Sequence, residues 1–133
     1  MVRTKKIMVV DDEPDITITL KKGLEEYKQE QSSVLKLFEV DTFNDPELAL
    51  SNFKPGFYDI LIIDIKLPKI NGFELCDKIR QIDDKVKVCF ISAFDINYHA
   101  LREMFPLLDI ECFIPKPIII SELIGRINAE VKE

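Results

Sequence analysis

Residues 7–24 read IMVVDDEPDITITLKKGL, a short apolar run followed by three acids, a proline and a longer mixed segment. The run from Ile7 to Val10 is short and mostly β-branched, which is typical of a buried strand. Pro14 suits the first turn of a helix, and the apolar residues after it recur at spacings of four and three. These residues are Ile16, Leu20, Leu24 and Tyr27. The stretch therefore predicts a strand followed by an amphipathic helix.

The same alternation recurs along the chain. Four further apolar runs predict strands at Val34 to Val40, Tyr58 to Ile63, Val86 to Ile91 and Ile110 to Ile114. Helical spacing predicts buried residues in three more helices: Leu48, Ala49 and Phe53; Leu75, Cys76, Ile79 and Ile82; and Leu123, Ile124, Ile127 and Val131. A less regular helix is expected between a cap at Asp95 and Pro106. The polar segment Lys28 to Lys36 is expected to be a helix end followed by a surface loop.

This order of elements predicts an α/β fold, because parallel strands need helical crossovers between them. We expect a flavodoxin-like doubly wound sheet of five parallel strands in the order 2-1-3-4-5, with five helices. The five strand and helix units use nearly all of the 133 residues. The chain is therefore expected to be a single domain over residues 1–133, without a separate output domain.

The composition of the chain argues against several classes of protein. The chain has 18 Lys and Arg against 24 Asp and Glu, a net charge of −6, which does not favour direct binding of nucleic acid. Its apolar runs are too short to span a bilayer, and no signal peptide is recognisable, so we expect a cytoplasmic protein without membrane insertion. The odd count of three cysteines without a CxxC spacing favours a reducing compartment and small buried thiols over a disulfide framework.

Polar residues directly follow four of the predicted strands. In open parallel sheets, ligands bind beyond the carboxyl ends of the strands, where the strand order reverses. The residues at those positions are Asp11, Asp12, Glu13, Asp64, Ser92 and Lys116. Each has a plainer explanation as a helix cap, a loop residue or a surface residue. Their convergence at one edge of the sheet favours a shared site instead.

The residue types in this set suit phosphate chemistry. Three crowded carboxylates, Asp11, Asp12 and Asp64, repel one another unless one is protonated or a cation binds. Oxygen ligands without His or Cys favour Mg²⁺, which keeps room for a phosphate. A carboxylate can then attack phosphorus to give an aspartyl phosphate. Lys116 supplies a positive charge for a phosphate oxygen, and Ser92 supplies a hydroxyl donor.

Four segments carry a resemblance to a known family: Val9 to Pro14, Asp64 to Gly72, Ser92-Ala93 and Lys116-Pro117. Together they resemble the signature segments of response-regulator receiver domains of two-component signalling, including the chemotaxis receivers. The resemblance implies that Asp64 accepts the phosphoryl group and that Lys116 holds one of its oxygens. It also implies that Asp12, Asp64 and the backbone carbonyl of Lys66 bind Mg²⁺, with Asp11 contributing through water.

The resemblance further implies a switch and a set of partners. In the family, the residues matching Ser92 and Phe113 report phosphorylation to the output face, although Phe113 could instead be a plain core aromatic. Lys66 and Phe94 flank the site, where they can obstruct water and set the lifetime of the phosphate. The implied donor is a sensor histidine kinase or a histidine phosphotransfer domain, and the implied receiver of the signal is a downstream output protein or domain. Such a domain promotes only its own phosphorylation and dephosphorylation, so we expect no enzyme with separate turnover.

Departures from the family pattern lie on the expected output face. They are Pro106, the pair Leu108-Asp109 and Ile118. These residues leave open the output partner and the mode of a phosphorylation-dependent homodimer. The phosphorylation residues themselves are intact.

Two alternatives stay open. A haloacid-dehalogenase-like phosphatase also uses a nucleophilic Asp with Mg²⁺, but it needs an acid two positions further on, where Asp64 is followed by Lys66. The other alternative is an unphosphorylated receiver-like interaction module, against which the intact set of Asp12, Asp64, Ser92 and Lys116 argues. Sustained release of phosphate from a phosphate ester would favour the phosphatase.

Overall fold

A computed structural model describes residues 1–93, 98–106 and 112–131 of the chain. Strands and helices alternate in it, apart from one extra strand. The elements are β1 (Val2–Val10), α1 (Pro14–Glu26), β2 (Lys28–Gln31), β3 (Val34–Phe43), α2 (Pro46–Asn52), β4 (Ile60–Asp64), α3 (Gly72–Arg80), β5 (Lys87–Ser92), α4 (Tyr98–Met104), β6 (Phe113–Pro115) and α5 (Ile120–Glu130).

The sheet has the order β2-β3-β1-β4-β5-β6. Its five parallel strands are the predicted ones, and they stand in the predicted order. The register brings their carboxyl ends level: Val10 lies beside Phe43 and Ile63, and Ser92 lies beside Pro115. Residues that follow these strands therefore gather along one edge of the sheet.

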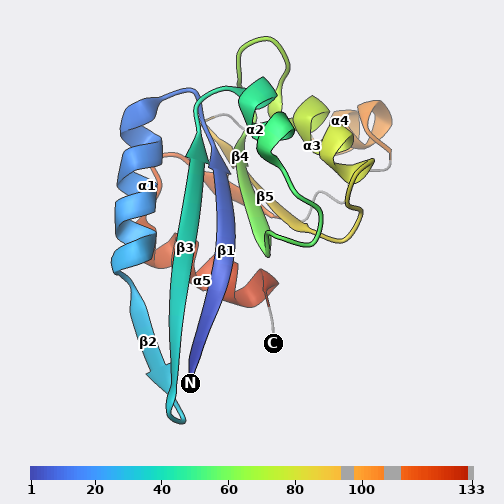
Figure 1. The fold of residues 1–133 in the computed structure, drawn as a ribbon. Coiled ribbons are helices and arrows are strands. Elements are labelled where there is room, and N and C mark those ends of the chain that lie inside the picture. The colour runs from blue at the N-terminus through green and yellow to red at the C-terminus, as the bar shows by residue number, and fades with distance from the viewer. Residues whose placement is uncertain (94–97, 107–111, 132–133) are drawn as a thin grey trace.

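Helices cover both faces of the sheet, with α1 and α5 on one side and α2, α3 and α4 on the other (Figure 1). Side chains of β1 alternate between the two resulting cores. Ile7 and Val9 pack with α1 and α5, whereas Met8 and Val10 pack with α2 and α3, and all four are fully buried. Burial on both faces explains why the parallel strands read as nearly continuous apolar runs.

Some predicted core positions are wrong. Leu48 is 56% exposed because its neighbour Ala49 points to the sheet, and adjacent residues of a helix point in different directions. Ile82 is 48% exposed because α3 ends at Arg80, before the helical spacing can bring this residue back to the core. Val131 is partly buried and does pack against the core, so this prediction is confirmed in part. The predicted cap Asp95, the site-flanking Phe94 and the start of the predicted strand at Ile110 lie outside the described residues.

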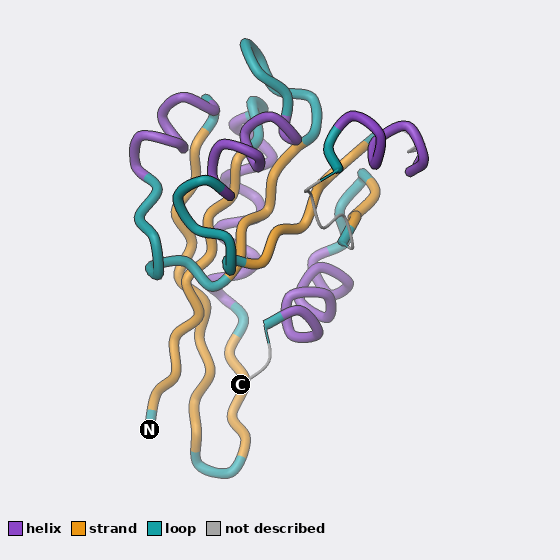
Figure 2. The backbone as a smooth tube through the Cα atoms, turned by 90° about the vertical axis from the view of Figure 1, so that its right-hand side faces the viewer, coloured by secondary structure: helices purple, strands orange, loops and turns teal. Residues whose placement is uncertain are grey.

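The segment Lys28 to Lys36 was predicted to be a helix end followed by a loop, and this prediction is wrong. Helix α1 ends at Glu26, and residues 28–31 form β2, which pairs antiparallel with β3. Ser32 and Ser33 join the two strands, with φ angles of 52° and 66°. Positive φ at both central residues is the mark of the tight turn that suits a twisted hairpin. The hairpin extends beyond the helices at one end of the sheet (Figure 2).

The cysteines also depart from the prediction. Cys89 and Cys112 form a disulfide, whereas Cys76 is a free, buried thiol whose pKa burial raises to about 11. The pairing follows from the sheet, because Phe90 lies beside Phe113 and the preceding residues are Cys89 and Cys112. Among the described helices the longest, α1, has 13 residues, and none could cross a membrane.

Candidate functional site

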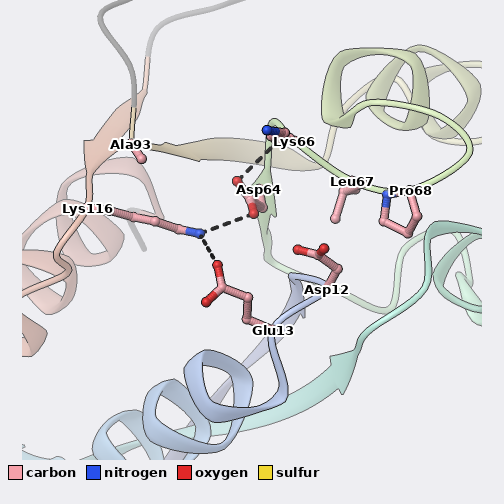
Figure 3. A pocket seen from close by; sticks show the side chains of 8 residues that line it. All are labelled: Asp12, Glu13, Asp64, Lys66, Leu67, Pro68, Ala93 and Lys116. Atoms are coloured by element: carbon pink, nitrogen blue, oxygen red, sulfur yellow. Dashed lines mark hydrogen bonds and ion pairs between the residues drawn. The ribbon is translucent and has the colours of Figure 1, made fainter.

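A cavity of about 460 Å³ lies at the carboxyl edge of the sheet. Loops after β1, β4, β5 and β6 contribute its walls, so segments far apart in the sequence meet there (Figure 3). The lining residues are Asp12, Glu13, Asp64, Lys66, Leu67, Pro68, Ala93 and Lys116. The structure thus brings together residues that the sequence predicted as one site.

Lys116 is the cation at the centre of this cavity. Its Nζ lies 3.2 Å from Asp64 Oδ2, 3.2 Å from Asp11 Oδ2 and 3.5 Å from Glu13 Oε1. The backbone N–H of Lys116 donates to the carbonyl of Ser92 at 2.9 Å, which fixes the start of its loop against β5. Burial acts to lower the pKa of Lys116, but Asp11 and Asp64 outweigh it and raise the pKa. The ammonium is therefore charged at neutral pH.

Asp11 lies beneath the cavity and is fully buried. Its Oδ1 accepts from the backbone N–H of Glu13 at 2.9 Å, whereas its Oδ2 accepts no hydrogen bond from the described residues, although Lys116 is near. Burial is the largest influence on the pKa of Asp11 and raises it; the Glu13 N–H and Lys116 act against this, and the charge of Asp64 adds to it. Oδ2 of this buried carboxylate therefore has the Lys116 ammonium as its one described partner, and a divalent cation in the cavity would add a second.

Asp64 ends β4, whose five residues are all buried, and is itself only 4% exposed. The loop that follows is packed tightly onto it. Gly72 is required there, because a Cβ at this position would lie 2.3 Å from the carbonyl oxygen of Asp64. The N–H of Gly72 donates to the Ile65 carbonyl at 2.7 Å, and the Asn71 side chain caps α3. The backbone N–H of Lys66 faces Asp64 Oδ1 at 3.4 Å.

Two supporting residues were missed by the sequence reasoning. Asn44, which follows β3, donates from Nδ2 to the carbonyl of Asp11 at 2.8 Å and to Thr17 Oγ1 at 3.0 Å, and so fixes the acidic loop. Its position at the carboxyl edge was a usable signal, although it has no ionisable group. Lys69 has φ of 68° and bonds Asp45 at 3.1 Å, which ties the loop after Asp64 to α2. No sequence signal pointed to this link.

The acidic residues fit a divalent cation. One carboxylate oxygen from each of Asp11, Asp12 and Glu13 lies within 4.8 Å of the other two. Asp12 is exposed and reaches the cavity opposite Asp64 (Figure 3). A set of oxygen ligands without sulfur or imidazole suits Mg²⁺. The chemistry of these donors therefore fits the predicted cation.

Ser92 and Phe113 lie on neighbouring strands beside the cavity. Ser92 ends β5 and is 6% exposed, directly before the cavity residue Ala93. Phe113 begins β6 and is partly buried, with its ring 5.8 Å from that of Phe90 and 6.4 Å from that of Phe73. Phe113 therefore belongs to an aromatic cluster on the α3 and α4 side of the sheet, not to the cavity.

A second cavity of about 540 Å³ adjoins the first. The two share Glu13 and Lys116, and the second extends along α1 towards the loop before α5. Its apolar lining comes from Ile16, Leu20, Pro117 and Ile118. An apolar groove thus leads to the charged site.

Comparison with known proteins gives a consistent picture. The family of response regulator receiver domains matches residues 7–128. The chain is 29% identical over 128 residues to the transcriptional regulatory protein PrrA of Mycobacterium leprae, and 32% identical over 124 residues to the response regulator ArlR of Staphylococcus aureus. These alignments cover 96% and 93% of this chain but only 50% and 51% of the relatives. The chain therefore spans about half the length of the curated relatives it matches.

Solved structures with the same fold include two receivers from other bacteria. The non-phosphorylated HemR receiver domain from Leptospira biflexa is 26% identical, with a TM-score of 0.77, over 97% of this chain and 95% of that one. The response regulator TrrA from Thermotoga maritima, in complex with Mg²⁺ and BeF, is 30% identical, with a TM-score of 0.72, over 95% and 98%. The match of the family over most of the sequence establishes the identity: the chain belongs to the response regulator receiver domains of two-component systems.

Proposed function

We propose that this receiver domain accepts a phosphoryl group on Asp64 from a phosphohistidine donor. A carboxylate oxygen of Asp64 attacks phosphorus, a P–O bond forms, the P–N bond breaks, and the imidazole leaves with the bonding electrons. The observation that supports this most is the Lys116 ammonium at 3.2 Å from Asp64 Oδ2 in an open cavity lined by acids. A cation already placed beside the nucleophile can receive a phosphoryl oxygen once Asp64 is esterified.

The acidic residues would hold Mg²⁺ in this proposal. Asp11, Asp12, Asp64 and the backbone carbonyl of Lys66 are the proposed ligands, with Asp11 acting through water. When bound, the cation neutralises charge on the transferring phosphoryl group. The closeness of Asp11 and Asp12, whose oxygens lie within 4.8 Å of each other and of Glu13, supports a cation here, and Asp64 and Lys66 line the same cavity.

Phosphorylation would be reported through Ser92 and Phe113. A phosphoryl dianion draws the Ser92 hydroxyl towards it, which frees space for Phe113 to turn inward and alters the face formed by α4, β6 and α5. Two features support a connection between the residues: β5 and β6 are paired, and Lys116 is hydrogen bonded to the Ser92 carbonyl. Phe113 is also only partly buried, so one side of its ring faces solvent.

The proposed donor is a sensor histidine kinase or a histidine phosphotransfer domain. The apolar groove along α1 suits docking of such a protein, because it shares Lys116 and Glu13 with the phosphate cavity. A domain docked there can present its histidine to Asp64. The names of PrrA and ArlR describe regulators, and by analogy we propose that this domain acts on a downstream output protein or domain in the cytoplasm. It performs no separate catalytic turnover.

Intact-mass spectrometry with acetyl phosphate and Mg²⁺ tests the proposal. The wild-type protein and Asp84→Asn, a change of an exposed acid away from the cavity, should each gain the mass of one phosphoryl group. Asp64→Asn should gain none, and wild-type protein with excess chelator should gain much less. Equal labelling of Asp64→Asn would refute the site, and continued release of phosphate from a phosphate ester would favour the phosphatase alternative.

A further inference from the structure

On the β3 side of the sheet, the outer strand edge is covered by other residues at one end and uncovered at the other. Near the cavity, side chains of α1 cover the edge of β3: Glu25 accepts the backbone N–H of Val40, and Lys21 donates to the carbonyl of the same residue. Further from the cavity the outermost strand is β2, which has a neighbouring strand on one side only among the described residues. An uncovered strand edge is a template for pairing with another chain.

The charges of β2 are complementary to those of a second, antiparallel copy of the same strand. It reads Lys28-Gln29-Glu30-Gln31, and Lys28 and Glu30 are both exposed. If two copies pair antiparallel about a two-fold axis through Gln29, Lys28 of each copy lies opposite Glu30 of the other. The symmetry makes this contact twice, and opposite charges facing each other across strands stabilise the pair.

Apolar side chains continue this face next to β2. The register sets Lys28 beside Leu37 and Glu30 beside Leu35, so these four side chains share one face of the sheet. Leu35 and Leu37 are only partly buried, and Val2, which lies beside Leu35 in β1, is 58% exposed. Joining two hairpins would extend this partly apolar face across both copies.

We propose that β2 is a self-association edge, at which two copies of this chain join their sheets by antiparallel pairing of β2. The hairpin lies at the opposite end of the sheet from the strand ends that line the cavity (Figure 1). Antiparallel pairing about a two-fold axis then points the two domain bodies in opposite directions. Both phosphorylation sites therefore stay open in the pair. The association does not need Asp64, so it is independent of the proposed phosphoryl transfer.

Analytical ultracentrifugation of the full chain over a range of concentrations tests this edge. The wild type should form a reversible dimer. Lys28→Glu and Glu30→Lys each place like charges opposite one another twice, so each should raise the dimer dissociation constant by about tenfold or more. An equimolar mixture of the two variants should regain the wild-type affinity, because every facing pair again joins opposite charges. The double variant Lys28→Glu/Glu30→Lys should regain it as well.

Two controls make the test specific. Lys85→Glu makes the same charge change at an exposed site far along the chain and should leave the dimer unchanged. Asp64→Asn should also dimerise normally, which separates this edge from the phosphorylation site. Wild-type protein that stays monomeric at the highest concentration would overturn the proposal. Dimers that form equally well in Lys28→Glu, in Glu30→Lys and in the wild type would overturn it too.

Discussion

The two ends of the sheet differ in how deeply their charged side chains are buried. At the cavity end, Asp11 and Asp64 are almost completely buried and face one partly buried cation, Lys116. At the hairpin end, the opposite charges of Lys28 and Glu30 in β2 are both exposed. Exposed pairs contribute about 1 kcal/mol or less, whereas removing one partner of a buried pair costs several times more. Acidic and lysine side chains thus form a buried, chemically capable site at one end of the sheet and a solvated surface at the other.

The backbone shows the same contrast. The cavity end depends on close approaches, such as Gly72 against the Asp64 carbonyl and the Lys116 N–H against the Ser92 carbonyl. The hairpin end closes through a turn of two exposed serines. We therefore expect substitutions at the cavity end to have the larger effects.

The largest expected effect comes from Gly72→Ala. The new methyl group would overlap the Asp64 carbonyl, and neither backbone can move freely, so the free energy of unfolding should fall by about 3 kcal/mol or more. Urea denaturation measures this loss. The matched control is Gly125→Ala in α5, where nothing lies within 4 Å of the new methyl group. That change should leave stability unaltered or raise it by up to about 1 kcal/mol. Equal effects at the two positions would show that the loop is not packed as described.

The disulfide fastens the middle of β5 to the residue before β6 and should rank next. It closes a loop with a sequence separation of 23, so reduction should lower the free energy of unfolding by about 3 kcal/mol. Thiol titration in denaturant should find one reactive thiol, that of Cys76, before reduction and three after it. Three reactive thiols without reductant would mean that the bond is absent.

The next effect is expected from Asp11→Asn, measured without divalent cations. Because the folded protein raises the pKa of Asp11, this residue stabilises the fold below its unfolded pKa, and that contribution is lost as pH rises through the folded pKa. Asn cannot ionise, and Lys116 keeps Asp64 as its partner, so the variant should be more stable than the wild type at pH 7. The advantage should shrink as pH falls. A variant that is less stable at pH 7 would contradict the raised pKa.

Glu25→Gln should show the opposite sign and the smallest effect. Burial acts to raise the pKa of Glu25, but the Val40 N–H and Lys21 outweigh it and lower the pKa. Its stabilisation is therefore present above the unfolded pKa and lost as pH falls through the folded pKa. The variant should be less stable than the wild type at pH 7 by less than about 1 kcal/mol, since the side chain is exposed. Thermal unfolding at pH 7 and pH 3 should show this difference only at the higher pH.

Sequence reasoning succeeded best at the cavity end. Four of the five parallel strands are short apolar runs followed by a chemically distinctive residue, so Asp11, Asp64, Ser92 and Lys116 could be placed at one edge from strand order alone. The contacts of Asn44 and Lys69 could not be placed, because they depend on side-chain directions and on a positive φ that the sequence does not announce.

The hairpin end was predicted poorly for physical reasons. Strand β2 is polar throughout and carries no apolar alternation, and its turn is Ser32-Ser33 instead of the usual Asn-Gly. The disulfide was missed because the pairing of Cys89 with Cys112 depends on the register of β5 and β6, which spacing along the chain does not reveal.

Chemical mapping of the phosphorylated residue tests the central claim most directly. After treatment with acetyl phosphate and Mg²⁺, borohydride reduces an aspartyl phosphate to homoserine, and peptide mass spectrometry then locates the reduced residue. We expect homoserine at position 64, none at Asp11 or Asp12, and no 5-hydroxynorvaline, the corresponding product of glutamate, at Glu13. Homoserine at another position, or a phosphorylated protein with an unaltered Asp64, would contradict the account.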